Sequence, residues 1–169
     1  MLIAKYNGLE YLCTIDGINV YILTSIKEKA TEEFLYEEEK YYKEFTPKEK
    51  LNIFDIEEIS DIFELQCWVE YDTKLDNVPK KWEVSFDLID FTNDSVTVYY
   101  SWGHLPNWTI CDKYMCLKKL TEQDISSCKI VKHYIKKDNI LFDQPKIIEE
   151  IVDFNTLIKT LTQYQDENI

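Results

Sequence analysis

Five cysteines and two histidines are the side chains of this chain best suited to bind a metal ion or to act as a nucleophile. Cys111 and Cys116 are four residues apart, His104 precedes them, and Cys128 and His133 follow. Thiolates and imidazoles are the usual ligands of structural zinc, but such sites are built from two close pairs, and a second close pair is missing here. Cysteine also serves as a small apolar core residue. We therefore expect no metal.

Hydrolytic chemistry is the other possibility that these residues raise. Cys111 with His104 could form a nucleophile and its base, and 32 acidic residues make carboxylate pairs unavoidable by chance. Neither pattern is specific. The chain has three glycines, two of them in turn motifs, so there is no glycine-rich loop for nucleotide phosphates. We expect no cofactor, no catalytic residue and no enzymatic activity. A small hydrolase using His104 with Cys111 or a carboxylate stays an alternative.

The loop from Trp102 to Trp108 is the best candidate for a functional surface. It contains two tryptophans and a histidine, punctuated by glycine and proline, in a chain of which 14% is aromatic. Exposed aromatic side chains are enriched at the energetic centres of protein interfaces. The alternative is that both tryptophans cap the core of the sheet.

The net charge of the chain limits the kinds of partner that it can bind. The net charge is −13, which repels nucleic-acid phosphates and anionic membranes and attracts a basic protein. The simpler interpretation is that the charge only keeps the protein in solution. The first residues contain neither a basic segment nor a sustained apolar one, so we expect a cytoplasmic protein with reduced thiols.

These residues must be positioned by a sheet. Residues 67–72, 82–89 and 96–101 are rich in β-branched and aromatic side chains and alternate as strands do. At the N-terminus, Asn7-Gly8 and Asp16-Gly17 are hairpin signals that predict a three-strand meander over 2–6, 9–15 and 18–24.

Helices are predicted on either side of the central strands. Apolar residues recur at helical spacing over 27–44 and again from Pro47 to about 65, where Ile59, Ile62 and Phe63 form the stripe. Thr121 and Asp124 predict the start of a helix to about 137, although 129–134 could be extended. Residues 140–142 are expected as a strand, 147–152 as a strand or helix, and Asn155 as the cap of a last helix. The expected fold is one α+β domain over 1–169, with a mostly antiparallel sheet, an N-terminal three-strand meander and helices packed on it.

A class-level resemblance accompanies these features. The meander at Asn7-Gly8 and Asp16-Gly17, the strand at Trp82-Glu83-Val84, and two acidic segments, 37–39 and 55–64, resemble those of immunity proteins of bacterial polymorphic toxin systems. The resemblance implies tight binding to a cognate toxin domain, often a basic nuclease, which the immunity protein neutralises by covering its active site.

From composition we assign two groups of partner-binding residues. Acidic residues for steering are Glu57, Glu58, Asp61 and Glu64, and residues for anchoring are Trp102, His104 and Trp108. The main alternative is another protein-interaction module, such as a phage-encoded mimic of nucleic acid, which would need carboxylates at phosphate-like spacing along one face.

Overall fold

The protein is built mainly from β-strands. The computed structural model describes residues 1–48, 52–86 and 91–165. The chain is 53% strand and 11% helical, and α1 (Phe154–Gln165) is the one α-helix in the described ranges. The predicted α+β class is therefore wrong, because the antiparallel sheet is present but the helices expected to cover it are mostly strands.

Two compact units make up the chain. The first comprises Met1–Leu65, Lys132–Ile148 and Gln163–Ile169, and the second comprises Gln66–Val131 and Glu149–Thr162. Strands β6, β11 and β12 contribute residues to both units.

The strands form two separate antiparallel sheets. The larger sheet has the order β12-β11-β6-β1-β2-β3-β5-β4, with β7 also paired to β6, and the smaller has the order β8-β10-β9. The strands of the larger sheet are β1 (Leu2–Tyr6), β2 (Leu9–Asp16), β3 (Asn19–Thr24), β4 (Leu35–Glu37), β5 (Lys40–Phe45), β6 (Ile59–Glu70), β7 (Lys81–Val84), β11 (Ser127–Lys137) and β12 (Ile140–Val152). Those of the smaller sheet are β8 (Ser95–Tyr100), β9 (Thr109–Ile110) and β10 (Cys116–Thr121).

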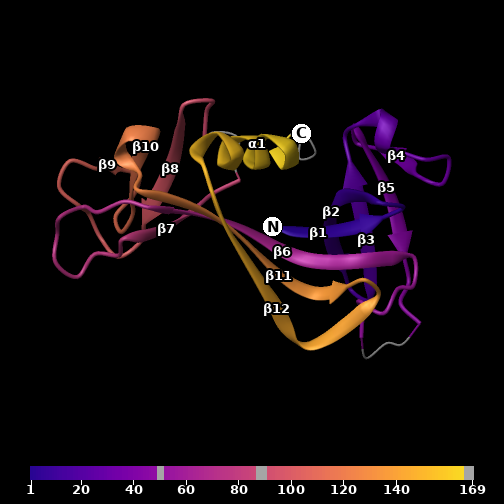
Figure 1. Cartoon of the computed structure of the whole chain (residues 1–169). Helices are drawn as coiled ribbons and strands as arrows, with labels where there is room; N and C mark the ends of the chain where they lie inside the picture. The colour runs from indigo at the N-terminus through magenta and orange to yellow at the C-terminus, as the bar shows by residue number, and fades with distance from the viewer. Residues whose placement is uncertain (49–51, 87–90, 166–169) are drawn as a thin grey trace. The chain divides into compact units, whose positions relative to one another are not determined.

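The predicted N-terminal meander is confirmed in β1, β2 and β3 (Figure 1). Asn7 and Gly8 both have positive φ, as a two-residue hairpin turn requires. The second turn is displaced by one residue from the predicted one. Asp16 pairs with Asn19, so Gly17 and Ile18 are the turn residues, and only the first has positive φ.

An aromatic core lies on one face of this meander. Tyr6, Tyr11, Phe34 and Phe45 are buried, with ring centroids 5.4 to 6.4 Å apart. Burying these rings accounts for the first failed helix prediction: residues 27–44 form a single 3-10 turn (Lys27–Lys29) and the β4–β5 hairpin. Glu38 and Glu39 adopt positive φ in that hairpin turn, a local cost that is offset by burial of Phe34 and Phe45.

A β-bulge explains the second failed helix. Tyr6 pairs with Ile59 and Lys5 pairs with Asp61, so Ser60 is an extra residue in β6. The bulge puts Ile59 and Ile62 on the same face of the sheet, where both belong to the aromatic core. Their spacing of three residues therefore imitates a helix. Residues 49–51 of this predicted helix, and residues 87–89 of the strand predicted over 82–89, lie outside the described residues.

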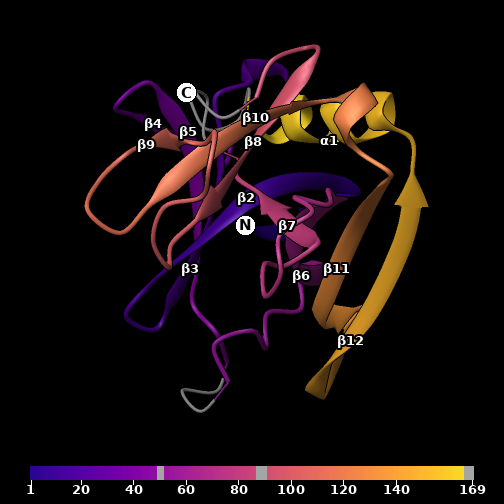
Figure 2. The ribbon, with the colours of Figure 1, turned by 90° about the vertical axis from the view of Figure 1, so that its left-hand side faces the viewer.

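The third predicted helix, from Thr121 to about 137, is wrong: most of its residues form β11, which is joined to β12 as a hairpin (Figure 2). Thr121 and Asp124 do form a capping box, but it caps one 3-10 turn (Glu122–Asp124) before β11 begins. Residues 129–134 and 147–152, for which both helix and strand were considered, are strands. The turn at Asp138 and Asn139 is held against β6, because Asp61 accepts a hydrogen bond from Asp138 N at 2.8 Å and Asn139 N donates to Ser60 O at 2.9 Å.

The predicted last helix is confirmed as α1, with a different cap. Asp153, rather than Asn155, accepts the hydrogen bond of Thr156 N at 2.7 Å through its carboxylate. Leu157 and Leu161 are fully buried one turn apart, so the apolar stripe of α1 faces the protein interior. Within 1–48, 52–86 and 91–165, no helix has the length and apolar character needed to cross a membrane.

Candidate functional site

The loop between β8 and β10 is held by its own backbone hydrogen bonds. Gly103 N donates to Tyr114 O at 3.0 Å, and Cys111 N donates to Met115 O at 3.0 Å. The Asp112 carboxylate accepts from Tyr114 N at 2.7 Å, which closes a tight turn. These bonds join two segments of the loop, so the side chains that they carry have defined positions.

A proline-containing turn directs one tryptophan inward. Trp108 N donates to Leu105 O at 3.2 Å, and Asn107, the third residue of this turn, has φ of +65°. A type II turn requires positive φ at its third residue, which asparagine tolerates, and commonly has proline second. Trp108 then packs on Trp82 and Tyr71, with ring centroids 5.1 and 6.5 Å away, and is 9% exposed.

Trp108 is thus a core residue of the second unit. Its neighbour Trp82 donates from the indole nitrogen to Tyr71 O at 3.0 Å and lies edge-on to Tyr100. We assigned Trp108 to partner anchoring, but its side chain is already covered by these rings. The structure therefore matches the alternative interpretation, in which Trp108 caps the core.

Trp102 has the opposite environment. It is 88% exposed, and Tyr114 and Ile110 in the facing segment are 63% and 62% exposed. We call these three residues the aromatic tip. Gly103, next to Trp102, is hydrogen-bonded to Tyr114, so the tip combines exposed apolar side chains with a fixed backbone. Such a surface can bind another protein with little loss of conformational entropy.

His104 supports the aromatic tip from within the loop. Its Nε2 atom lies 2.8 Å from Asp112 O, and because a carbonyl only accepts, this nitrogen carries the proton. The side chain is exposed, but the bond ties the histidine to its own loop. The hydrogen bond makes His104 a brace for the loop, and its role as a partner anchor stays a prediction.

The predicted acidic residues all lie in the first unit and do not form one surface. Glu57, Glu58 and Glu64 are exposed, whereas Asp61 is 8% exposed and accepts the Asp138 N–H. Asp61 and Glu64 are three residues apart on a strand, past the bulge, so they point to opposite faces. Asp61 therefore stabilises the β11–β12 turn, and its carboxylate is not exposed for direct contact with a partner.

Glu57 already has a basic neighbour. Its carboxylate forms an ion pair with Lys48, and the hydrogen bond from Lys48 lowers the pKa of Glu57 below its ordinary value. Both side chains are exposed, so the pair contributes little to stability.

The cysteines do not lie together as a ligand set. Cys111 is exposed, whereas Cys116 is fully buried and its sulfur accepts a hydrogen bond from Leu105 N at 3.3 Å. Burial raises the pKa of the Cys128 thiol to about 11. In the part of the chain that the structure describes, no three His, Cys, Asp or Glu side chains are grouped so that they could hold a metal ion.

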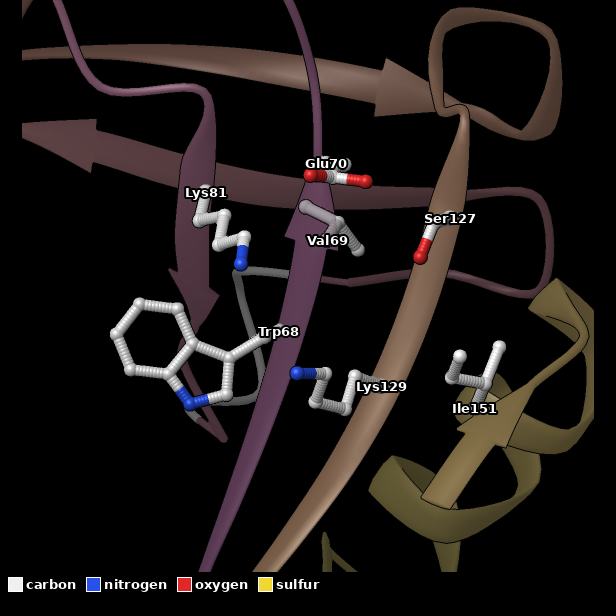
Figure 3. A pocket seen from close by; sticks show the side chains of 7 residues that line it. All are labelled: Trp68, Val69, Glu70, Lys81, Ser127, Lys129 and Ile151. Carbon is white, nitrogen blue, oxygen red and sulfur yellow. The ribbon is translucent and has the colours of Figure 1, made fainter. Parts of the chain in front are cut away.

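A shallow groove crosses β7, β6 and β11 in the second unit (Figure 3). We call it the lysine groove, after Lys81 and Lys129, whose amino groups extend toward the Trp68 side of β6. Lys129 forms an ion pair with Glu149 at 2.9 Å, and the amino group of Lys81 has no hydrogen-bond or ion-pair partner among the described residues. The cavity holds about 210 Å³ and is lined by Trp68, Val69, Glu70, Lys81, Ser127, Lys129 and Ile151.

The lysine groove suits a single side chain better than a substrate. Small-molecule sites usually measure roughly 300–1,000 Å³, and this cavity is smaller. Two ammonium groups beside an indole could receive a carboxylate. No histidine or cysteine lines the groove, so the general base most common in enzymes is missing from its described lining.

Sequence reasoning missed Tyr114, Ile110 and the lysine groove. A signal for Tyr114 existed, because Asp112 two residues before it predicts a turn that would expose it. For Lys81 and Lys129 there was none, since only the pairing of β7 and β11 with β6 brings them together. No family model, no curated protein and no solved structure matches the chain.

Proposed function

We propose that this chain is a binding protein that neutralises a basic protein partner, as immunity proteins do with their toxins, and that the aromatic tip is its contact surface. The observation that carries the proposal is the 88% exposure of Trp102 on a loop fixed by backbone hydrogen bonds. An exposed tryptophan is a source of binding energy that the folded chain itself does not use.

The tip has the composition of an interface centre. Tryptophan and tyrosine are the residues most enriched at binding hot spots, because they bury a large area with few rotatable bonds. Trp102 and Tyr114 supply both, and Ile110 adds an aliphatic side chain. The bond between His104 and Asp112 O keeps this arrangement before a partner arrives, so less entropy is lost on binding.

Net charge supports a basic partner. A charge of −13 raises the association rate of a cationic protein and opposes binding to nucleic acid or an anionic membrane. The exposed Glu57, Glu58 and Glu64 contribute to this long-range field. The proposal includes a cytoplasmic location, no enzymatic activity, and a toxin such as a nuclease as the partner.

The test begins with tagged full-length chain and a lysate of its native host. A basic protein retained after a high-salt wash is identified by mass spectrometry, purified, and titrated against variants by calorimetry. Trp102→Ala should weaken binding by about 10- to 100-fold, the range of an interface hot spot, and Tyr114→Ala by less. The association rate for the unmodified chain should fall as NaCl is raised.

A matched control is available in the first unit. Tyr36 on β4 is 62% exposed, almost the same as Tyr114, and Leu35 is as exposed as Ile110. Tyr36→Ala and Leu35→Ala should leave the affinity unchanged. Equal affinity for Trp102→Ala and the unmodified chain, or loss of every captured protein in the high-salt wash, would refute the proposal.

A further inference from the structure

Strand β12 leaves one edge of the larger sheet open. It is the last strand in the sheet order, paired to β11 alone among the described strands (Figure 2). Over 143–148 all its residues are exposed, including Ile147 at 57% and Ile148 at 39%, and Ile140 at the start of the strand is 61% exposed. An open edge with apolar side chains is a template for another strand.

The hairpin turn determines which backbone groups face outward. Asp138 and Asn139 both have positive φ, which defines a two-residue turn whose flanking residues, Lys137 and Ile140, form a hydrogen-bonded pair. We infer that Ile140 and every second residue after it, as far as Ile148, direct their backbone toward β11. Leu141, Asp143, Pro145 and Ile147 direct theirs to the open edge, and proline is tolerated in a sheet where its nitrogen faces out.

We propose that a second copy of this chain pairs with this edge, giving a symmetric antiparallel dimer through residues 140–148 with its two-fold axis at Gln144. In such a pair the residue numbers opposite each other are symmetric about 144. Ile140 then lies opposite Ile148, Leu141 opposite Ile147, and Phe142 opposite Lys146. Apolar residues meet apolar residues, and a lysine meets an aromatic ring.

Charge explains why the segment fits itself. The chain carries −13, yet over 140–148 Asp143 and Lys146 cancel, so this segment itself adds no net charge to the contact between two copies. Each copy also donates the outward N–H groups of Leu141, Asp143 and Ile147, while Pro145 contributes only its carbonyl. The backbone groups of the open edge are then largely satisfied by those of the second copy.

Neighbouring registers are less favourable. An axis at Asp143 sets two aspartates opposite each other, and an axis at Lys146 does the same with two lysines. An axis at Pro145 places two residues without an N–H at the centre of the ladder. The axis at Gln144 instead sets two neutral amides face to face. This inference concerns a different unit from the aromatic tip and stands independently of the proposed function.

The register predicts a disulfide at one position. Gln144 directs its backbone toward β11, so across the dimer the two Gln144 residues form a non-hydrogen-bonded pair with Cα atoms about 4.5 Å apart. This separation lies within the range for a disulfide, roughly 4.4–6.8 Å. We would introduce Gln144→Cys, Asp143→Cys and Lys146→Cys separately into full-length Cys111→Ser chain, which removes the exposed thiol, and oxidise each variant.

Gln144→Cys should form a cross-linked dimer at least about tenfold faster than Asp143→Cys or Lys146→Cys, since only residue 144 lies opposite itself. Sedimentation of unmodified chain between about 10 µM and 1 mM should show a dimer whose fraction rises with NaCl, because salt screens the repulsion between two acidic chains. Gln144→Lys should shift the dimer to monomer, with its circular dichroism unchanged. Equal cross-linking at the three positions, or a monomer at every concentration and salt, would overturn the proposal.

Discussion

Strands β6 and β12 have similar lengths, 12 and 13 residues, and both are rich in isoleucine and in acidic residues, but their environments are opposite. β6 lies between β1 and β11 in the sheet, and Ile59, Ile62 and Leu65 are fully buried. β12 is at the end of the order, and Ile151 is 77% exposed. Composition does not distinguish the two strands. Position in the sheet decides which isoleucines stabilise the fold and which are left for association.

The same contrast recurs in one loop of the second unit. Trp108 packs among Trp82 and Tyr71, while Trp102, six residues earlier, is 88% exposed. The type II turn at Leu105–Trp108 separates their environments. In both cases the buried member accounts for stability, and the exposed member is a candidate for binding.

The largest difference between buried and exposed positions should be seen in thiol labelling. Cys67 on β6 is fully buried and burial raises its pKa to about 12, whereas Cys111 is exposed. At pH 8, Ellman's reagent should label Cys111 at least about 10³-fold faster than Cys67, which reacts only when β6 opens. Cys111→Ser should remove the fast phase. A second fast thiol in that variant would mean that the buried strand opens readily.

Truncation of the tryptophans should give the next largest effect. Trp108→Ala should lower the free energy of unfolding by about 3–5 kcal/mol, because it leaves a cavity beside Trp82. Trp102→Ala should change it by less than about 0.5 kcal/mol. Urea denaturation measures both, and a large loss for Trp102→Ala would show that the exposed ring belongs to the fold.

Isoleucine truncation compares the two strands directly. Ile62→Ala on β6 should cost about 2–5 kcal/mol, since the side chain is fully buried in the aromatic core. Ile147→Ala on β12 should cost less than about 0.5 kcal/mol at low protein concentration. If the β12 edge pairs with a second copy, the Ile147→Ala cost should increase with concentration, because the dimer contributes to stability by mass action.

The smallest effect should be the pH dependence of the α1 cap. Hydrogen bonds from Thr156 lower the pKa of Asp153 below its ordinary 3.8, so the cap stabilises the folded chain above that pH and loses this effect as pH falls through the folded value. The difference in urea midpoint between unmodified chain and Asp153→Ala should be constant from pH 7 to 5 and shrink below pH 4. Asp76→Ala, at an exposed turn, is the control. An equal difference at all pH values would show that the carboxylate charge is unimportant.

Local signals predicted the elements whose conformation is set by neighbouring residues. Asn7-Gly8 formed its hairpin because both residues accept positive φ, and α1 formed where an apolar stripe follows a capping residue. Glycine and proline also marked the loop from Trp102 to Trp108 in the sequence, but they did not show which of its tryptophans is exposed. Tyr114 was missed although Asp112 signalled its turn.

The conformation of the other elements depends on tertiary contacts. The spacing of Ile59 and Ile62 is helical in the sequence, and only pairing with β1 across a bulge makes it a strand. The charged segment 27–44 became a hairpin because Phe34 and Phe45 join a core that Tyr6 and Tyr11 supply from elsewhere. Thus the sequence by itself determined the first hairpin turn, the last helix and the net charge. Which strands are central, which edge stays open and which tryptophan is exposed were decided by contacts between residues far apart in the chain, and local preference does not encode such contacts.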